Sequence, residues 1–465
     1  MKEVIRTKII PDRQQFAKID SQHILNYKAI CIFASTGFFL GEDAYFNDET
    51  VLQPATEYSI DEKNIVMNSK KYWQWFYEPR EISLKQATDE FAHILEKITD
   101  ENLKGRKIIL PLSGGLDSRT QAAAINSNSD VCCYSYKFEN SFDETKYGKL
   151  ICETGNFRFK EFIIHSGYLW NVISKLSDIN KCYADFTHPR QMAVIDKISE
   201  LGDIFYLGHW GDVLFDDMKV KDNISADEQT ELVMKKVLKK SGKELAVNLW
   251  QHWGLSGSFE IYLEERISKL LNEIKIDNAN SRIRAFKSTY WAPRWTSANM
   301  NVFSDFKPVY LPYYSDEMCK FICTIPENLL AGRKIQIEYI KMKNPALAEI
   351  PWQTYDPFNL YNFNEYDNKK NLPLRGYKKI KRLIKEKIFG RKTVTRNWEI
   401  QFCGKDNDEK LRHYIFEESF VKEFVHKDTV EYFYGMFKNN DQVYYSHSVS
   451  MLLTLSLFSG KYLRR

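Results

Sequence analysis

The stretch Ile-Ile-Leu-Pro-Leu-Ser-Gly-Gly-Leu-Asp-Ser-Arg, residues 108–119, decides the fold of this 465-residue chain. Ile108 to Leu110 form a short apolar run of the kind that a buried parallel strand needs. Ser113-Gly114-Gly115 interrupts this run ahead of a helical segment from Ser118 to Ile125. The sequence therefore predicts a strand, a glycine turn and a helix, the unit from which a doubly wound parallel α/β sheet is built.

The glycine turn has the properties of an anion-binding loop. Gly114 and Gly115 carry no Cβ, so backbone N–H groups can approach a phosphate, and the following helix N-terminus adds about half a positive charge. Asp117 and Ser118 stand at the helix start, where a carboxylate can hold a cation and a hydroxyl can donate to phosphate oxygens. The turn therefore predicts a nucleotide with its metal ion as the ligand.

The string Ser113-Gly114-Gly115-Leu116-Asp117-Ser118 resembles the pyrophosphate loop of the N-type ATP pyrophosphatases, which include the asparagine synthetases, β-lactam synthetases and lasso-peptide cyclases. It is not a Walker loop, because no Gly-Lys-Ser/Thr follows. The resemblance implies an adenine nucleotide alpha hydrolase-like fold in which these six residues bind ATP. It also implies Mg²⁺ as the metal, cleavage of ATP between the α and β phosphates, and an acyl-adenylate that ammonia or an amine attacks.

A second apolar segment, Ile204 to Leu207, also runs into a glycine-flanked loop that carries an acid, Gly208 to Asp212. Carboxylates at the ends of two neighbouring strands can share Mg²⁺, which prefers one or two carboxylates with phosphates and water. We therefore expect Asp117 and Asp212 to be the metal ligands. The loop resembles the family's Gly-x-Gly-x-Asp-Glu segment at Gly208, which the resemblance places beside the nucleotide, and at Asp212.

Two further positions have a family counterpart. His209 stands where the family has a catalytic Glu or Tyr, and an imidazole with a pKa near 6.5 accepts a proton from an attacking ammonium more readily than a carboxylate near 4. His209 is therefore the candidate catalytic base, with a non-catalytic loop histidine as the competing interpretation. Tyr136 ends a predicted strand from Val131 and matches the position whose backbone faces adenine, although an ordinary strand aromatic explains it equally well.

Residues 1–82 are predicted to form a truncated antiparallel β layer. Residues 29–34, 37–40 and 57–60 are short segments separated by turn residues. In asparagine synthetases this place is held by a glutaminase domain with an N-terminal cysteine, whereas residue 2 here is Lys and the first cysteine is Cys31. We expect a non-catalytic remnant over 1–82, and a synthetase-like domain with a C-terminal helical extension over 83–465.

The later family segments fit less well. The Lys that neutralises the departing pyrophosphate in the family has no clear match, and Trp352 to Phe358 occupies its place. Arg391 and Lys392 are candidate substitutes, although a solvated helix face explains their basic run at least as well.

Composition excludes several classes of protein. The 66 Lys and Arg residues against 62 Asp and Glu leave a net charge of +4, which gives no support to nucleic-acid binding. No apolar run reaches the roughly 18 residues that a membrane span requires, so we expect a cytoplasmic protein. The eight cysteines show no metal-binding spacing and are expected to be free thiols.

These observations favour an AMP- and pyrophosphate-forming amide synthetase. Its partners would be ATP, a carboxylate such as aspartate, a sugar uronic acid or a peptide side chain, and ammonia or an amine from solution or from a partner glutaminase. Amidation of a sugar acid in surface-polysaccharide biosynthesis is a special case. A nucleotide-binding pseudoenzyme is the alternative, favoured by His209, by Val213 in place of the family's Glu and by the missing Lys.

Overall fold

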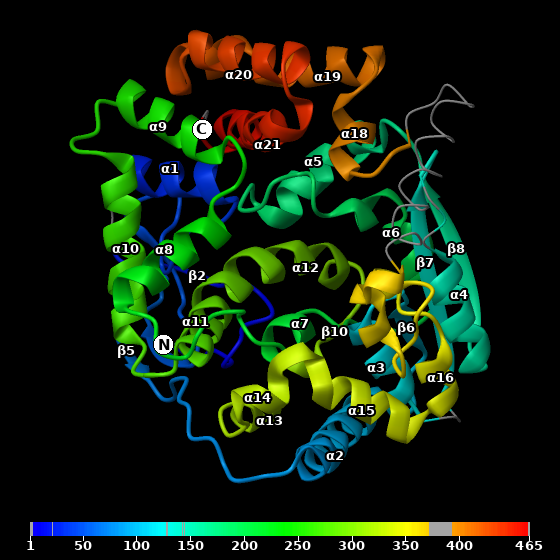
Figure 1. Cartoon of the computed structure of the whole chain (residues 1–465). Coiled ribbons are helices and arrows are strands. Elements are labelled where there is room, and N and C mark those ends of the chain that lie inside the picture. Colours follow the sequence, from blue (N-terminus) through cyan, green and yellow to red (C-terminus); the bar gives the residue numbers. More distant parts are fainter. Residues whose placement is uncertain are drawn as a thin grey trace.

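A five-stranded parallel sheet in the order β10-β9-β6-β7-β8 lies on the right-hand side of the molecule in Figure 1. The computed structural model describes residues 3–20, 22–126, 129–141, 143, 145–371 and 393–463. The strands are β6 (Ile108–Pro111), β7 (Val131–Phe138), β8 (Arg158–Ile164), β9 (Ile204–Tyr206) and β10 (Val309–Tyr310). The predicted parallel α/β sheet is therefore confirmed.

The strand order reverses at β6. Ile109 pairs with Cys132 of β7 on one side and with Phe205 of β9 on the other, and both pairings are parallel. The chain continues from β6 to β7 and β8, and then returns to β9 and β10 on the opposite side. Such a reversal leaves a crevice at the carboxyl ends of the strands on its two sides, here β6 and β9.

Helices cover both faces of the sheet. Phe205 packs edge-to-face on Phe303, with ring centroids 4.9 Å apart, whereas the next residue, Tyr206, shares a hydrogen bond of 2.7 Å with Thr99 on the opposite face. Burial on both faces explains why these strands are apolar throughout. The face of Thr99 carries α2 (Leu84–Leu103), α3 (Leu116–Ala124), α4 (Thr145–Thr154), α15 (Lys334–Lys343) and α16 (Pro345–Glu349), and the face of Phe303 carries α5 (Tyr168–Asn180) and α12 (Ser297–Ser304).

The N-terminal segment contains two small antiparallel sheets and a helix. The sheets are β1-β4-β5 (Glu3–Arg6, Thr56–Ile60, Val66–Lys71) and β2-β3 (Phe16–Lys18, Glu49–Val51), so the strand predicted at residues 57–60 is confirmed. The strand predicted at residues 29–34 is wrong, because that run lies in α1 (Tyr27–Thr36), and residues 37–40 form no strand.

Helix-capping residues explain why α1 forms. Asn26 accepts the backbone N–H of Ala29 at 3.1 Å, and Gly37 ends the helix in the left-handed region, with its N–H on the carbonyl of Phe33 at 2.8 Å. A short apolar run is compatible with a strand or with a buried helix, and the caps at its two ends decide between them. Both faces of α1 are buried.

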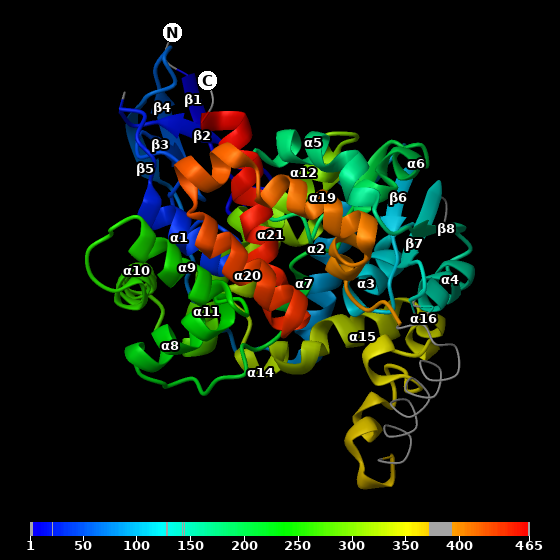
Figure 2. The same cartoon turned by 90° about the horizontal axis from the view of Figure 1, so that it is seen from above.

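The expected C-terminal apolar helix is α21 (Gln442–Phe458), and it packs beside α1 and α9 (Gly242–His252) (Figures 1 and 2). His447 Nε2 donates to the carbonyl of Ala34 at 3.0 Å, which joins α21 to α1. The start of the chain therefore shares a core with its end. Further helices are α6 (Ile195–Ser199), α7 (Gly211–Leu214), α8 (Ala226–Val237), α10 (Phe259–Glu273), α11 (Ala279–Phe286), α13 (Asp316–Ile322), α14 (Glu327–Leu330), α18 (Asn397–Phe402), α19 (Lys405–Ile415) and α20 (Lys427–Asn439).

A π-helical segment, η2 (Lys287–Thr296), continues α11 into α12 and is held by the N-terminal segment. The buried guanidinium of Arg294 donates to the carbonyls of Gly41 at 2.9 Å and Asp43 at 2.6 Å. Gln14 Nε2 donates in turn to the carbonyl of Arg294 at 2.8 Å. Among the helices of the described residues, none is long and apolar enough to cross a membrane, and all eight cysteines are free.

We predict that His447 makes the fold sensitive to acid. Burial lowers its pKa to about 4, whereas an unfolded histidine titrates near 6.5, so the unfolded chain binds the extra proton between these values. The stabilisation is complete above pH 6.5 and is lost as the pH falls toward 4, a difference on the order of 3 kcal/mol. Urea unfolding at pH 8 and pH 5 should show a smaller loss for His447→Gln than for wild type. Equal losses in the two proteins would contradict this assignment.

Candidate active site

A cavity of about 660 Å³ opens at the carboxyl ends of β6, β7 and β9. Seven of the residues expected at the site line it, and they are Ser113, Asp117, Ser118, Tyr136, Gly208, His209 and Asp212. The other three expected loop residues, Gly114, Gly115 and Leu116, are outside its lining. The structure thus brings the two sequence motifs together at one crevice, as the strand order requires.

The loop after β6 is closed by its own hydroxyl groups. The backbone N–H of Ser113 donates to Ser118 Oγ at 3.2 Å, and the N–H of Gly115 donates to Ser113 Oγ at 3.3 Å. A phosphate that binds these amides would have to take the place of the two hydroxyls. The hydroxyl of Ser118 lies at the start of α3, where it could then donate to the same phosphate.

Gly114 is required for packing. A Cβ at this position would lie 2.4 Å from Gln353 Cβ and 3.0 Å from Tyr147 Cγ, and the N–H of Gln353 donates to the carbonyl of Gly114 at 3.2 Å. Trp352 to Phe358, the segment in place of the family's Lys, therefore contacts the loop through Gln353, which also lines the cavity. Arg391 and Lys392, the candidate substitutes for that Lys, lie outside the described residues.

Asp117 is paired with a cation that the sequence analysis did not identify. Its Oδ1 accepts a hydrogen bond from the guanidinium of Arg333, and a second from Gln336 Nε2 at 3.2 Å. Burial raises the pKa of Asp117 and the charge of Asp212 raises it further, while Arg333 lowers it. Arg333 and Gln336 are three residues apart at the start of one helix, so their side chains lie on the same face. This spacing is the one sequence feature that could have suggested that both contact the same carboxylate.

The glycines of the second loop allow it to lie against Asp117. A Cβ at Gly211 would lie 2.1 Å from Asp117 Oδ1, and one at Gly208 would lie 3.1 Å from Asp117 Cβ and 2.6 Å from Gln121 Oε1. Between them Trp210 adopts a left-handed conformation, with φ at 78°, and its indole N–H donates to Ser288 Oγ at 3.1 Å. The backbone of this loop is therefore fixed against the carboxylate by close contact.

The two expected metal ligands, Asp117 and Asp212, line the same cavity and interact electrostatically. Within the described part of the chain, no group of three or more His, Cys, Asp and Glu residues could hold a metal ion. Two carboxylates suit Mg²⁺ that arrives with phosphate oxygens and keeps several waters, and they do not suit a cage made by the protein alone. The donor set therefore fits a metal-nucleotide, provided that Arg333 releases Asp117.

His209 lines the cavity, but the pKa expected for it is wrong. Burial lowers the pKa of His209 to about 4, with the charge of Arg190 acting in the same direction and that of Asp212 opposing it. The imidazole is therefore neutral at pH 7 and can accept a proton, although it has no advantage in basicity over a carboxylate. Its Nδ1 is buried and has no hydrogen-bond partner in the described structure.

Tyr136 contributes its side chain to the cavity. Its hydroxyl accepts a hydrogen bond of 2.8 Å from Arg190 Nε and one of 3.3 Å from Gln191 Nε2. Its backbone belongs to the β7–β8 ladder, opposite Phe162. Arg190 and Gln191 also line the cavity, at the start of η1 (Arg190–Ala193), and the sequence analysis did not select them.

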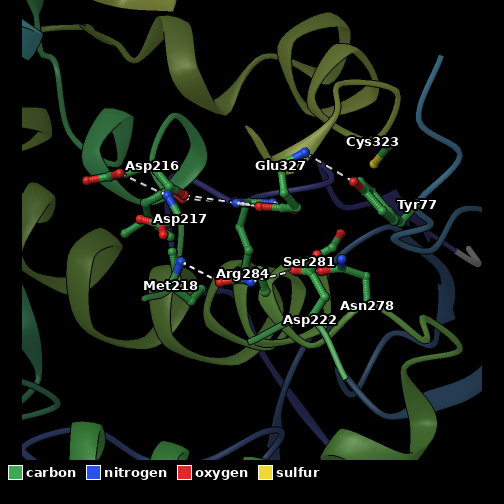
Figure 3. A network of polar contacts seen from close by, with 12 residues as sticks. Tyr77, Asp216, Asp217, Met218, Asp222, Asn278, Ser281, Arg284, Cys323 and Glu327 are labelled. Atoms are coloured by element: carbon green, nitrogen blue, oxygen red, sulfur yellow. Dashed lines mark hydrogen bonds and ion pairs between the residues drawn. The ribbon is translucent and has the colours of Figure 1, made fainter. Parts of the chain in front are cut away.

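A buried ion pair fixes the chain that follows Asp212 (Figure 3). Arg284 of α11 and Glu327 of α14 form two hydrogen bonds of 2.6 Å each, and both side chains are buried. Arg284 also donates to the carbonyls of Val213 at 3.2 Å and Asp216 at 2.9 Å. The end of α7, the helix that contains Asp212, is therefore bound by Arg284 of α11, and Glu327 of α14 holds Arg284 in place.

The sequence matches no family model and no curated protein. Among solved structures, the NMN synthetase from Francisella tularensis is similar to this chain. The match covers 44% of this chain and 92% of that one, at 14% sequence identity and a TM-score of 0.22.

We predict that Gly211→Ala perturbs the site and the stability together. The new methyl group would lie 2.1 Å from Asp117 Oδ1 and 2.8 Å from Tyr313 Cε2, and overpacking of this kind costs about 1–3 kcal/mol. Gly435→Ala is the matched control, because Gly435 lies inside α20 with no atom within 4 Å of the added Cβ. That change should stabilise by about 0.5–1 kcal/mol. Equal urea midpoints for the two variants would show that the loop does not press on Asp117.

Proposed function

We propose that this chain is an ATP-dependent synthetase that activates a carboxylate as an acyl-adenylate and transfers the acyl group to ammonia or an amine. The observation that carries the proposal is the meeting of the Ser113–Ser118 loop and Asp212 at one cavity, at the carboxyl ends of neighbouring strands. Glycine-containing loops at helix N-termini bind phosphates, and paired carboxylates hold the accompanying Mg²⁺. The resemblance of the loop to the N-type ATP pyrophosphatases gives the reaction type.

The phosphates of ATP would lie on the loop after β6, where the backbone amides and the Ser118 hydroxyl are available after displacement of their internal partners. Bound Mg²⁺ would neutralise phosphate charge and orient the triphosphate. Asp117 can contact this ion only after it exchanges its hydrogen bond with Arg333. The guanidinium thus released is a cation beside the phosphates, and the pyrophosphate leaving group is the anion it would stabilise.

His209 is the proposed proton acceptor for the attacking amine. Its neutral imidazole lines the cavity beside the Asp212 loop, and Nδ1 has no partner among the described residues. Tyr136 and Gly208 are proposed to border the nucleotide, since both line the same cavity. Residues 1–82 are proposed as a remnant without glutaminase activity, which leaves solution or a partner glutaminase as the source of ammonia. Amidation of a sugar acid in surface-polysaccharide biosynthesis remains a special case of this activity.

A nucleotide-binding pseudoenzyme is the second candidate. The observation that favours it is the contact between Arg333 and Asp117, which neutralises one of the two carboxylates that the metal requires. A pyrophosphate-release screen across carboxylic acids, with and without ammonia, separates the two candidates, because only the synthetase releases pyrophosphate in the presence of its acid.

We predict that Asp117→Asn abolishes substrate-dependent exchange between ATP and labelled pyrophosphate. An amide keeps the shape of the side chain but not the charge that holds Mg²⁺ against phosphate. The thermal transition of the variant should first be shown to be cooperative, since Arg333 loses its partner. Exchange within about twofold of wild type would remove Asp117 from the metal site.

We predict a different result for His209→Ala. Base catalysis contributes about 10²–10⁴-fold, so amide formation should slow by about that factor while exchange of pyrophosphate continues. A loss of both activities would assign His209 to nucleotide binding. Unchanged amide formation would place the base elsewhere in the cavity.

A further inference from the structure

One wall of the cavity is formed by tryptophans. Trp210 follows β9, and Trp291 and Trp295 lie on η2, one helical turn apart. The helix that η2 continues, α11, lies on the opposite side of α7 from α3 in both views (Figures 1 and 2). The tryptophan wall therefore includes part of the segment that carries His209 and Asp212, and Trp291 and Trp295 extend it along η2.

Two lysines lie over these indoles. Lys239 Nζ is 6.0 Å from the centroid of the Trp291 ring and 5.6 Å from that of Trp295, but Lys239 is outside the cavity lining, whereas Lys287 belongs to it. Lys287 Nζ is 5.7 Å from the centroid of the Trp210 ring and 5.5 Å from that of Trp291, within the range of a cation–π contact. In the described chain, the ammonium of Lys287 has no ion pair and no hydrogen bond. Burial lowers the pKa of Lys287 to about 8, although the charge of Asp212 raises it. A buried ammonium without an anionic partner is stabilised by an anion that enters the cavity.

The chemistry of the wall indicates which anion this is. A triphosphate carries several charges and requires backbone amides, guanidinium groups and a metal ion, for which the loop after β6, Arg333 and the two carboxylates are the proposed partners. Lys287 is the one ammonium of this wall that lines the cavity, and it matches one carboxylate joined to a body with apolar faces. Free aspartate offers no such body, because its remaining groups are a second carboxylate and an ammonium.

The indole nitrogens of the wall support the same conclusion. Trp291 Nε1 and Trp295 Nε1 are buried, and neither has an acceptor within the described residues. A buried donor without a partner is destabilising, because it has lost its hydrogen bonds with water. Oxygen atoms on the ring of a bound ligand would accept hydrogen bonds from these two indole N–H groups.

We propose that Lys287 holds the carboxylate of the acyl substrate against the indoles of Trp210, Trp291 and Trp295, and that this substrate is a ring-bearing carboxylic acid. The inference rests on the proposed function, because adenylation requires a carboxylate in this cavity beside ATP. Lys287 is thus a specificity-determining residue, whereas the loop after β6 serves any acid equally.

The test is isothermal titration of the full-length protein at pH 7 with three probes, D-glucuronate, benzoate and L-aspartate. Wild type should bind at least one ring-bearing probe saturably and more tightly than aspartate. Lys287→Met should weaken that binding by about 10–100-fold, since a hydrogen bond between charged groups is lost, and Lys287→Arg should keep most of it. Glucuronate and benzoate distinguish a sugar acid from an aromatic acid.

Lys28→Met is the matched control. Lys28 also lies over two rings, 5.7 Å from the centroid of Trp250 and 5.2 Å from that of Tyr262, but outside the cavity lining. Its replacement should leave probe binding unchanged, and the thermal transitions of all variants confirm that they fold. Equal probe affinities for Lys287→Met and wild type, tightest binding of aspartate, or no binding of either ring-bearing probe would overturn the proposal.

Titration of the same proteins with ATP and Mg²⁺ separates this inference from the synthetase activity. Unchanged ATP affinity in Lys287→Met, with weakened probe binding, supports the carboxylate site. A loss of ATP affinity alone would make Lys287 a phosphate ligand and overturn it. Failure of wild type to bind ATP, with the ring-bearing probe still bound through Lys287, would contradict the synthetase and leave the carboxylate site in place.

Discussion

The buried ion pair between Arg284 and Glu327 is the interaction on which the geometry of the site depends. Removing one partner of a buried pair costs about 3–5 kcal/mol, because the other charge remains in the interior. Loss of the pair would also disturb the chain after Asp212, because Arg284 donates hydrogen bonds to the carbonyls of Val213 and Asp216. The carboxylate of Asp216 accepts in turn from the N–H of Gly332 at 2.9 Å, beside Arg333. One network, of which Figure 3 shows Arg284, Glu327 and Asp216, thus connects the loop of Asp212 with the turn that carries Arg333.

If Asp117 holds Mg²⁺ as proposed, metal binding would be an exchange of partners. The structure shows Asp117 with its charge compensated by Arg333, in surroundings where burial raises the pKa of the carboxyl. An unpaired carboxylate at this depth would be costly, so the arginine stabilises the site in the absence of a nucleotide. Arg333 and Gly332 both have positive φ values, 60° and 71°, in the turn η4 (Ala331–Arg333). A change in this turn would move Arg333 away from the carboxylate.

Much of the fold could be predicted from the sequence, because its signals are local. The glycine turn after Ile108 to Leu110 and the apolar runs that form β6, β7 and β9 are each set by neighbouring residues. The strand expected at residues 29–34 failed because an apolar run has no period of its own, and the caps Asn26 and Gly37 decided for a helix. At the site, Arg333 and Lys287 were missed because they approach from helices distant in sequence. The pKa of His209 depends on burial, which no spacing reveals.

The hydrogen bonds of Arg294 connect the segment of residues 1–82 to the site. Arg294 lies between Trp291 and Trp295 on η2, and its guanidinium is satisfied by carbonyls of Gly41 and Asp43. The backbone of Gly41 and Asp43, within the segment proposed as a remnant, therefore binds the helix that carries the tryptophan wall. The backbone of Gly41 and Asp43 would therefore shape the pocket whether or not residues 1–82 ever had a catalytic role of their own.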